Sequence, residues 1–175
     1  AHAVDRANFN LGEFVLVIGA GPIGLTVTQF AKIAGGRIIV MDVNENRLDF
    51  CRQFFGVEFT VNAQENPVEQ LKAITSNDMP TVIFDATGSV KSMENAFSYV
   101  ASGGKLIFVG LVQDNIILYD PEFHRKEITL FSTRNSTGND FRRIITLVEQ
   151  NKIDTNPWIT HRATSDELID AFPTW

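Results

Sequence analysis

The sequence predicts an α/β fold, with a doubly wound parallel sheet of six strands and helices on both of its faces. Two observations lead to this prediction. Short apolar runs alternate along the chain with segments whose apolar residues recur at helical spacing. A glycine-rich turn, Gly19-Ala-Gly-Pro-Ile-Gly24, follows the first of these runs directly. Parallel neighbours require crossover connections, and right-handed crossovers place helices on both faces of the sheet.

The first half of the chain contains three strand-and-helix pairs. Its strands are expected at residues 14–18, 37–41 and 59–61. The first strand is an unbroken apolar run, which is typical of strands buried on both faces. Its helices are expected at residues 22–34, after the cap Asn44 and from Pro67 to about Thr75. Asn66 as N-cap, with Pro67 in the first turn and Glu69 as the capping-box acid, predicts the start of the third helix.

The second half repeats the alternation. Its strands are expected at residues 81–84, 105–109 and 128–132, and residues 115–119 are expected to form a short additional edge strand. Its helices are expected after Ser89, at Asp120-Pro121, after Thr137 and after a capping box at residues 164–167. The helix after Thr137 carries Phe141, Ile144, Ile145 and Val148 on one face. No low-complexity linker interrupts the pattern, so residues 1–175 are interpreted as one domain.

Composition excludes several classes of function. The chain has 175 residues, 44% of them hydrophobic, which is enough to bury a sizeable core. Its formal net charge of -6 argues against a nucleic-acid partner, because no basic stripe is available for phosphates. No apolar run reaches the length of a membrane-spanning helix, and the N-terminus has no signal-like stretch. A cytoplasmic protein without membrane contact is therefore expected.

Residues that often carry reactivity or bind metals have structural interpretations here. Cys51 is the single cysteine and shares an expected helical face with apolar residues, so a small buried side chain is favoured over a reactive thiol. Three histidines lie far apart in sequence without other ligands at metal-binding spacing, so no metal site is expected in this chain. They are His2, His124 and His161. Arg125 and Lys126 are interpreted as a solvated face.

The glycine-rich turn has the pattern of a dinucleotide-binding turn, and it lies between an expected buried strand and an expected helix. Gly19 permits the tight turn, Gly21 lets the backbone approach a pyrophosphate, and Gly24 lets the helix pack on the strand. The pyrophosphate would lie at the helix N-terminus, where free N–H groups and the positive end of the helix dipole point at it. Pro22 is compatible, because a first-turn proline lacks an N–H that would have been unpaired.

Asp42 ends the second expected strand, about 20 residues after the turn, as the acid of such motifs does. A carboxylate there can accept both hydroxyls of the adenosine ribose and repels a 2′-phosphate, so NAD is favoured over NADP. Arg47, one helical turn later, is expected to cover the adenosine portion, with a solvated cation as the alternative. The structural alternative for the whole motif is a turn with packing glycines only, and a solvated Asp42.

The ends of other strands belong to the same picture, because ligands on open α/β sheets lie beyond the carboxyl ends of the strands. Thr87-Gly88 is expected near the adenosine portion of the dinucleotide and Val109-Gly110-Leu111 near the nicotinamide, although each glycine could serve only its turn. Two other nucleotide-binding classes fit less well. The Tyr-x-x-x-Lys pair of short-chain dehydrogenases is missing, and Ile23 stands where the methyltransferase turn has glycine.

Several segments together resemble the cofactor-binding domain of zinc-type medium-chain alcohol and polyol dehydrogenases, which has a Rossmann-type sheet. They are Gly19-Ala-Gly-Pro-Ile-Gly24, Asp42, Asp85-Ala-Thr-Gly88, residues 103–110 and Trp158-Ile-Thr-His-Arg162. The likeness covers essentially the whole chain. Residues 120–127 and 133–141 are similar to the bacterial sugar-acid and polyol members of the family.

The resemblance implies a two-domain enzyme that passes a hydride from a secondary alcohol to NAD while a catalytic zinc polarises the alkoxide. In that family the zinc ligands and the proton-relay residues belong to an N-terminal domain. Zinc is therefore expected only in that other domain, and no catalytic residue is expected in this chain. Residues 1–175 are expected to be a single NAD-binding domain excised from a longer protein. A stand-alone module that senses NAD(H) through a partner is the alternative.

The resemblance also implies contacts residue by residue. The pyrophosphate contacts are Gly19, Gly21, Pro22, Ile23 and Gly24. The adenosine contacts are Asp42, Arg47, Thr87 and Gly88, and the nicotinamide contacts are Val109, Gly110 and Leu111. Arg134 resembles a family arginine that faces the nicotinamide or the substrate. Residues 116–118, Ile116-Ile-Leu118, would pair with their twin across a two-fold axis and extend the sheet through a homodimer.

Overall fold

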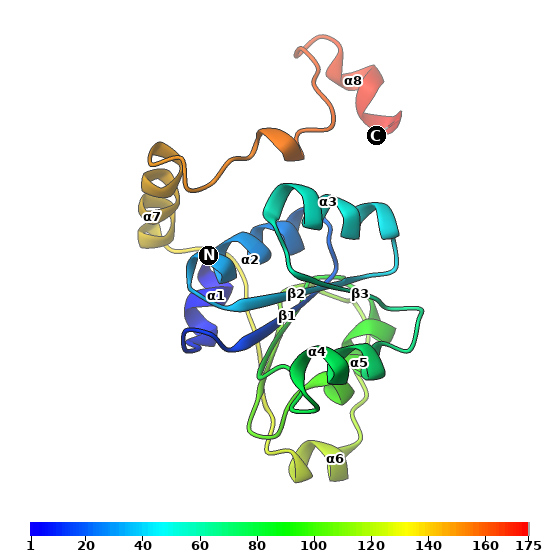
Figure 1. Cartoon of the computed structure of the whole chain (residues 1–175). Coiled ribbons are helices and arrows are strands. Elements are labelled where there is room, and N and C mark those ends of the chain that lie inside the picture. The colour runs from blue at the N-terminus through cyan, green and yellow to red at the C-terminus, as the bar shows by residue number, and fades with distance from the viewer. Residues whose placement is uncertain (175) are drawn as a thin grey trace.

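The computed structural model describes residues 1–174, and within them it contains a six-stranded parallel sheet (Figure 1). The strands are β1 (Phe14–Ile18), β2 (Arg37–Asp42), β3 (Phe59–Asn62), β4 (Val82–Asp85), β5 (Lys105–Phe108) and β6 (Thr129–Ser132). Their order in the sheet is β3-β2-β1-β4-β5-β6. The chain therefore runs outward from β1 to one edge and from β4 to the other, which confirms the predicted doubly wound fold.

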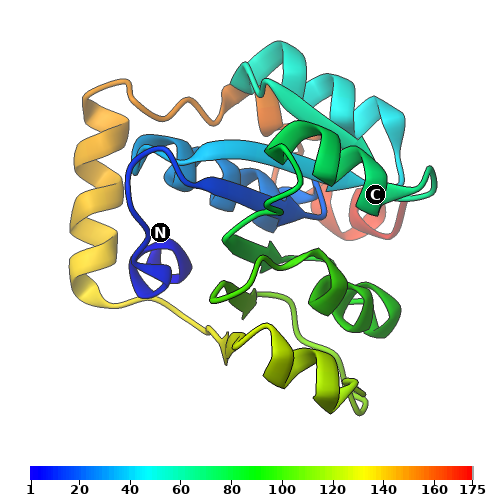
Figure 2. The same ribbon diagram turned by 60° about the horizontal axis from the view of Figure 1, so that its bottom comes forward.

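Helices cover both faces of this sheet. The helices of residues 1–174 are α1 (His2–Ala7), α2 (Pro22–Ile33), α3 (Glu45–Phe55), α4 (Pro67–Thr75), α5 (Val90–Tyr99), α6 (Asp120–Arg125), α7 (Gly138–Glu149) and α8 (Leu168–Ala171), with short 3-10 turns at Asn156–Trp158 and Phe172–Thr174. α7 and α8 lie away from the sheet (Figure 1). α2 and α3 lie on one side of the strands and α4 and α5 on the other (Figures 1 and 2). Among residues 1–174, every helix is too short or too polar to cross a membrane.

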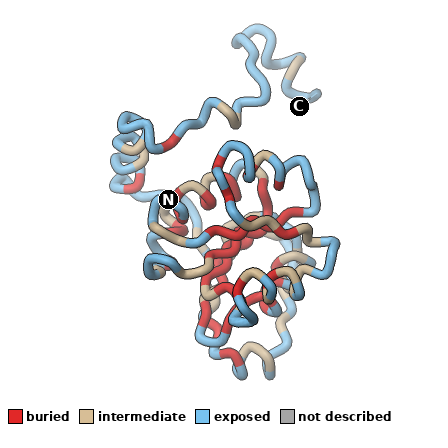
Figure 3. The backbone as a smooth tube through the Cα atoms, viewed as in Figure 1, coloured by how far each residue is buried: buried red, intermediate tan, exposed pale blue. Residues whose placement is uncertain are grey.

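The core has two layers because successive side chains of a strand point to opposite faces. Val15 and Val17 pack into the layer under α1, α2 and α3, whereas Leu16 and Ile18 pack into the layer under α4 and α5. Figure 3 shows the buried backbone concentrated in the sheet, with the C-terminal segment mostly exposed. Cys51 is fully buried in the first layer, as predicted, and burial raises the pKa of its thiol to about 11.

Three of the predicted helix caps are present. The side chain of Asn44 accepts from the N–H of Arg47 at 3.3 Å, and that of Ser89 accepts from Ser92. Thr137 forms a complete capping box with Asp140, whose carboxylate accepts from the Thr137 N–H at 2.6 Å. These caps satisfy N–H groups that a helix leaves unpaired in its first turn.

Two other predicted caps are wrong. Asn66 has a left-handed backbone (φ 51°) and makes no side-chain cap, because capping side chains reach the first turn from an extended backbone. Glu69 pairs with Lys72 instead, at 3.0 Å. At residues 164–167, the Glu167 carboxylate accepts from the Thr164 N–H at 2.9 Å, but α8 starts later, with Glu167 itself as its N-cap residue.

Residues 115–119 form no strand in the structure, contrary to the prediction. Ile116 and Leu118 pack on the layer under α4 and α5, whereas Ile117 is 75% exposed. The N–H of Ile117 donates to Glu94 Oε1 at 3.0 Å rather than to a neighbouring strand. The sheet edge beyond β5 is occupied by β6, so within residues 1–174 this segment has no strand beside it to accept ladder hydrogen bonds.

The interpretation of Lys126 as part of a solvated face is also wrong. Lys126 is 8% exposed, and its Nζ donates to the carbonyl oxygens of Ser98 at 3.0 Å and Phe97 at 3.4 Å, at the end of α5. A lysine there satisfies carbonyls that the last helical turn leaves unpaired. Burial lowers the pKa of the Lys126 ammonium. Arg125 is exposed, as predicted, and pairs with Glu122 at 2.6 Å.

Candidate functional site

A cavity of about 810 Å³ opens where β1, β2 and β4 end. It brings together seven predicted cofactor contacts, which are Gly19, Gly21, Pro22, Ile23, Asp42, Arg47 and Thr87. They come from the carboxyl ends of three neighbouring strands and from the loops and first helical turns that follow them. The carboxyl ends of parallel strands are the usual ligand-binding edge of such folds.

The glycine turn has the geometry that the sequence predicts. Gly19 has φ +95°, which L side chains rarely adopt. A Cβ on Gly24 would lie 1.7 Å from the carbonyl oxygen of Gly19, so only glycine lets α2 pack this closely. A Cβ on Gly21 would meet nothing within 4 Å, which leaves open space beside the turn. Gly21 provides no side-chain cap for α2, so its first-turn N–H groups are free for an anion.

Asp42 connects the end of β2 to the glycine turn. Its Oδ2 accepts from the N–H of Ala20 at 2.6 Å, and its Oδ1 accepts from the N–H of Asn44 at 2.8 Å. The residue is 6% exposed, so the alternative of a solvated strand-end charge is wrong. Each carboxylate oxygen has two lone pairs, so both can still accept a hydroxyl hydrogen from a ligand in the cavity.

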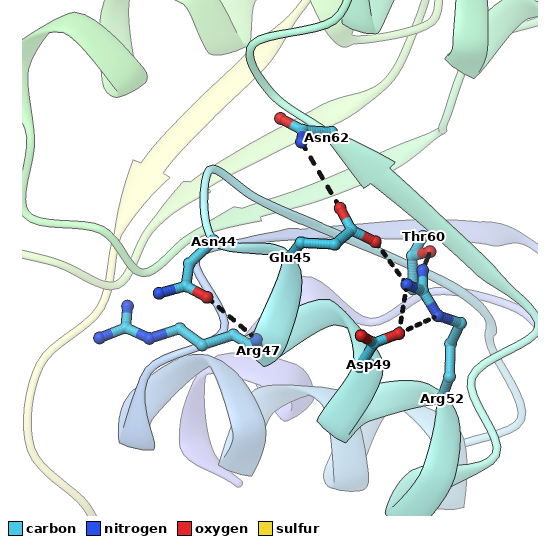
Figure 4. A network of polar contacts seen from close by, with 7 residues as sticks. All are labelled: Asn44, Glu45, Arg47, Asp49, Arg52, Thr60 and Asn62. Atoms are coloured by element: carbon cyan, nitrogen blue, oxygen red, sulfur yellow. Dashed lines mark hydrogen bonds and ion pairs between the residues drawn. The ribbon is translucent and has the colours of Figure 1, made fainter.

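The two arginines of α3 have different surroundings. Arg52 pairs with Glu45 at 2.5 Å and with Asp49 at 2.7 Å, and it also donates to Thr60 on β3. Arg47 points away from this cluster in Figure 4 and lines the cavity, with Nη1 3.8 Å from Asp42 Oδ2. Its side chain is 56% exposed, so its guanidinium is free to reorient toward a ligand.

The loops that follow β4 and β5 contact each other beside the cavity. A Cβ on Gly110 would lie 2.6 Å from the N–H nitrogen of Gly88, and one on Gly88 would lie 3.5 Å from the carbonyl oxygen of Leu111. Six further predicted contacts are not among the cavity-lining residues. They are Gly24, Gly88, Val109, Gly110, Leu111 and Arg134. Gly24 lies under the turn and the others beside it, whereas Arg134 is exposed beyond the end of β6.

Sequence reasoning assigned no role to several polar residues of this site. The cavity is also lined by Gln64, Lys91, Ser92, Asn95 and Tyr99. Lys91, Asn95 and Tyr99 follow one another at intervals of four residues along α5, so they share one helical face. That spacing could have indicated a polar stripe, but only the packing of α5 shows that the stripe faces the cavity.

Comparisons with known proteins identify the family. The family model described as zinc-binding dehydrogenase matches residues 22–150. The chain belongs to this family. The match begins at the first residue of α2 and includes Asp42 and the loops after β4 and β5, and it confirms the resemblance inferred from the sequence motifs.

The names of two relatives of this zinc-binding dehydrogenase chain refer to a sugar acid and to a polyol. It is 36% identical to L-galactonate-5-dehydrogenase of Escherichia coli K12, over 98% of this chain and 51% of that protein. It is 33% identical to L-arabinitol 4-dehydrogenase of Aureobasidium melanogenum, over 98% of this chain and 48% of that protein. The chain thus spans about half the length of the curated relatives it matches.

Solved structures of known dehydrogenases share this fold. An Escherichia coli CFT073 structure, named a short chain alcohol dehydrogenase and complexed with cofactor NADH, is 25% identical with a TM-score of 0.87. The match covers 98% of this chain and 51% of that one. Galactitol-1-phosphate dehydrogenase from Escherichia coli is 23% identical with a TM-score of 0.87, over 97% of this chain and 52% of that one, and shows the same fold.

Proposed function

We propose that residues 1–175 are the NAD(H)-binding domain of a zinc-dependent dehydrogenase that transfers a hydride from a secondary alcohol, such as a polyol or a sugar acid, to NAD. The observation that carries this proposal is the buried carboxylate of Asp42 beside the glycine turn, in one cavity. The NADH complex of a structural relative and the sugar and polyol names of sequence relatives support it.

The residues of the cavity fit a dinucleotide. The N–H groups at the start of α2 would bind the pyrophosphate, with Gly21 leaving the space for its approach. Asp42 would accept the ribose hydroxyls, and Arg47 would cover the adenosine. The Val109-Gly110-Leu111 loop and Arg134 would lie at the nicotinamide side. NAD supplies the hydride acceptor when bound, whereas the substrate and the catalytic zinc belong to the other domain.

The carboxylate of Asp42 also favours NAD over NADP. Its negative charge repels a 2′-phosphate at the ribose, and it is held in place by two backbone N–H groups, so it cannot turn away. Arg47 is the nearest cation, and its charge is already opposed by Asp42 at 3.8 Å. A phosphate at this position would therefore meet an anion that the protein keeps fixed.

The proposal includes a homodimer and a cytoplasmic location. Residues 116–118 have an exposed Ile117 and no strand beside them within residues 1–174, so a second copy of the chain could supply the missing ladder partner. A cytoplasmic location is in keeping with a buried reduced cysteine. No observation favours the alternative of a stand-alone NAD(H) sensor.

Titration of NADH fluorescence tests the proposal. We expect NADH to bind with clear preference over NADPH. Asp42→Ala should weaken NADH binding at least roughly tenfold, because both ribose hydroxyls lose an acceptor. It should also reduce the preference for NADH over NADPH, because the charge that repels the 2′-phosphate is removed. Asp78→Ala, which removes an exposed carboxylate from the loop before β4, is the matched control and should change neither quantity.

Two outcomes would contradict the proposal. One is a chain that binds no NADH or prefers NADPH. The other is turnover of an alcohol by this chain without the second domain. Because Asp42 also holds the Ala20 N–H, the folded state of Asp42→Ala is checked by circular dichroism, and the narrowed preference is the readout that a disturbed turn alone would not produce.

A further inference from the structure

Asp85 is a fully buried carboxylate at the ligand-binding edge of the sheet, and the proposed function gives it no role. It is the last residue of β4 and has an exposed fraction of 0%. It is paired in register with Ile18 of β1, which leads into the glycine turn, and with Phe108 of β5, which leads into the Val109-Gly110-Leu111 loop. Asp85 thus lies between these two loops.

Three hydrogen bonds hold the Asp85 carboxylate, which is the acceptor in each of them. Its Oδ1 accepts from the N–H of Thr87 at 2.9 Å and from the Thr87 hydroxyl at 2.6 Å, and its Oδ2 accepts from the Ser92 hydroxyl at 2.6 Å. Neither partner carries a charge. Within residues 1–174, no cation forms an ion pair with Asp85, so its negative charge is stabilised by dipoles and is not cancelled.

The main chain of Asp85 joins the two sides of the dinucleotide site. Its carbonyl oxygen accepts from the N–H groups of Val109 at 2.9 Å and Gly110 at 3.0 Å. The nicotinamide side of the proposed site is therefore fixed against the same residue that carries the buried charge. A dinucleotide that runs from Asp42 across the glycine turn to this loop passes over β4.

We propose that Asp85 shifts the binding preference of the site toward the oxidised dinucleotide relative to the reduced one, an inference that rests on the proposed NAD(H) binding. The nicotinamide ring of NAD⁺ carries a positive charge and that of NADH does not. The pyrophosphate, both riboses and the adenine are the same in the two forms, so their contacts cancel in the ratio of the two dissociation constants. What remains is the ring charge in the field of nearby fixed charges. Asp85 is a fully buried charge on the proposed nicotinamide side, whereas the other buried carboxylate of the site, Asp42, is on the proposed adenosine side.

Other charges around the site have weaker effects on this ratio. Arg47 and Lys91 line the cavity but are exposed, so solvent screens their charges. Arg134 is exposed beyond β6, where solvent screens its charge. Asp85 has no such screening, because water does not reach its side chain.

The test measures dissociation constants of NAD⁺ and NADH for the chain and for Asp85→Asn by calorimetry. Two unit charges about 10 Å apart, at an effective dielectric constant of about 20, change a binding constant roughly tenfold. We expect Asp85→Asn to weaken NAD⁺ relative to NADH by roughly this factor. A shared loss of affinity for both forms, which a disturbed loop would cause, leaves the ratio unchanged and would overturn the proposal.

A second variant keeps the test valid if Asp85→Asn does not fold. Ser92→Lys retains Asp85 and places an ammonium next to its Oδ2, so the NAD⁺ to NADH preference should shift in the same direction. Asp78→Asn is the matched control, because it removes an exposed carboxylate before the start of β4, at the opposite edge, and should leave the ratio unchanged. A chain that binds neither form contradicts the proposed function itself, whereas tight binding of both with an unchanged ratio contradicts only the role of Asp85.

Discussion

At the level of single residues, the site depends both on glycines, which have no side chain, and on buried carboxylates. Gly24 and Gly21 belong to the same turn, but their missing side chains have different consequences. The first leaves room for the backbone of the turn itself, and the second leaves room for a ligand. Asp42 and Asp85 show the complementary case, because each buried carboxylate accepts backbone or hydroxyl hydrogens and so fixes a loop in place.

The two glycines should therefore separate stability from binding. Gly24→Ala places a methyl group against the Gly19 carbonyl and should destabilise the fold by about 2 kcal/mol, with loss of NADH binding. Gly21→Ala, at φ -78° with open space around it, should leave stability nearly unchanged but weaken NADH binding. Urea unfolding and NADH fluorescence measure the two effects.

Gly138→Ala is the matched control for these variants. Gly138 is the first residue of α7, and a Cβ there would meet nothing within 4 Å, so neither stability nor NADH binding should fall. If Gly21→Ala bound NADH as well as the unmodified chain, the pyrophosphate would not approach the turn at this point, and the assignment of Gly21 would be wrong.

At the level of elements, α7 has a complete N-terminal cap but an apolar face that is only partly packed against the core. Its capping box is complete, so its start is defined by residues close in sequence. Its apolar face is only partly covered, because Ile144 and Leu147 pack on the core while Phe141, Ile145 and Val148 are 60%, 55% and 44% exposed. With little burial to support the helix, the cap carries a larger share of its stability.

Thr137→Ala should lower the free energy of unfolding by about 1 kcal/mol, because the first turn of α7 loses its cap. The hydrogen bonds from Thr137 lower the pKa of Asp140, so their stabilisation is present above the pKa of the unfolded chain, near 4, and is lost as pH falls through the lower folded pKa. The difference between variant and unmodified chain should therefore shrink between pH 7 and pH 3 in urea unfolding.

Thr155→Ala is the control for this cap. Thr155 precedes the 3-10 turn at Asn156–Trp158 and makes no side-chain cap, so its replacement should have little effect. A cost for Thr137→Ala that stayed the same at acidic pH would show that the hydroxyl acts through packing and not through the Asp140 carboxylate.

At the level of the whole molecule, the two core layers are complete while other apolar residues remain outside them. Side chains exposed by more than half include Leu11, Ile117, Phe141 and Ile169. Exposed apolar patches often mark surfaces that contact other chains or domains. The chain spans about half the length of the curated relatives it matches.

The proposed dimer predicts which of these residues matters for association. The chain should self-associate in sedimentation equilibrium, and Ile117→Lys should shift it toward the monomer, because a buried lysine would lose its solvation at the interface. Leu11→Lys, at a residue that is 82% exposed outside residues 116–118, should leave the association unchanged. Equal effects of both variants, or a monomeric unmodified chain, would contradict dimerisation through this segment.

Most of the fold and the centre of the site could be predicted from sequence, because both depend on local signals. Apolar runs marked the six strands to within a residue or two, and the caps Asn44, Ser89 and Thr137 depend on neighbours within four residues. Asp42 was predicted from its position at a strand end. The polar stripe of α5 and the buried Asp85 were not, because their surroundings come from distant parts of the chain.

The errors have the same cause. Lys126 looked solvated because its acceptors lie on α5, far back in the sequence, and residues 115–119 looked like a strand although no strand lies beside them. The sequence alone determined the α/β class, the glycine turn and its acid, since periodicity and spacing are properties of neighbouring residues. Only the tertiary structure decided which polar groups meet at the cavity and which are buried, because burial and hydrogen bonding depend on residues brought together from distant positions.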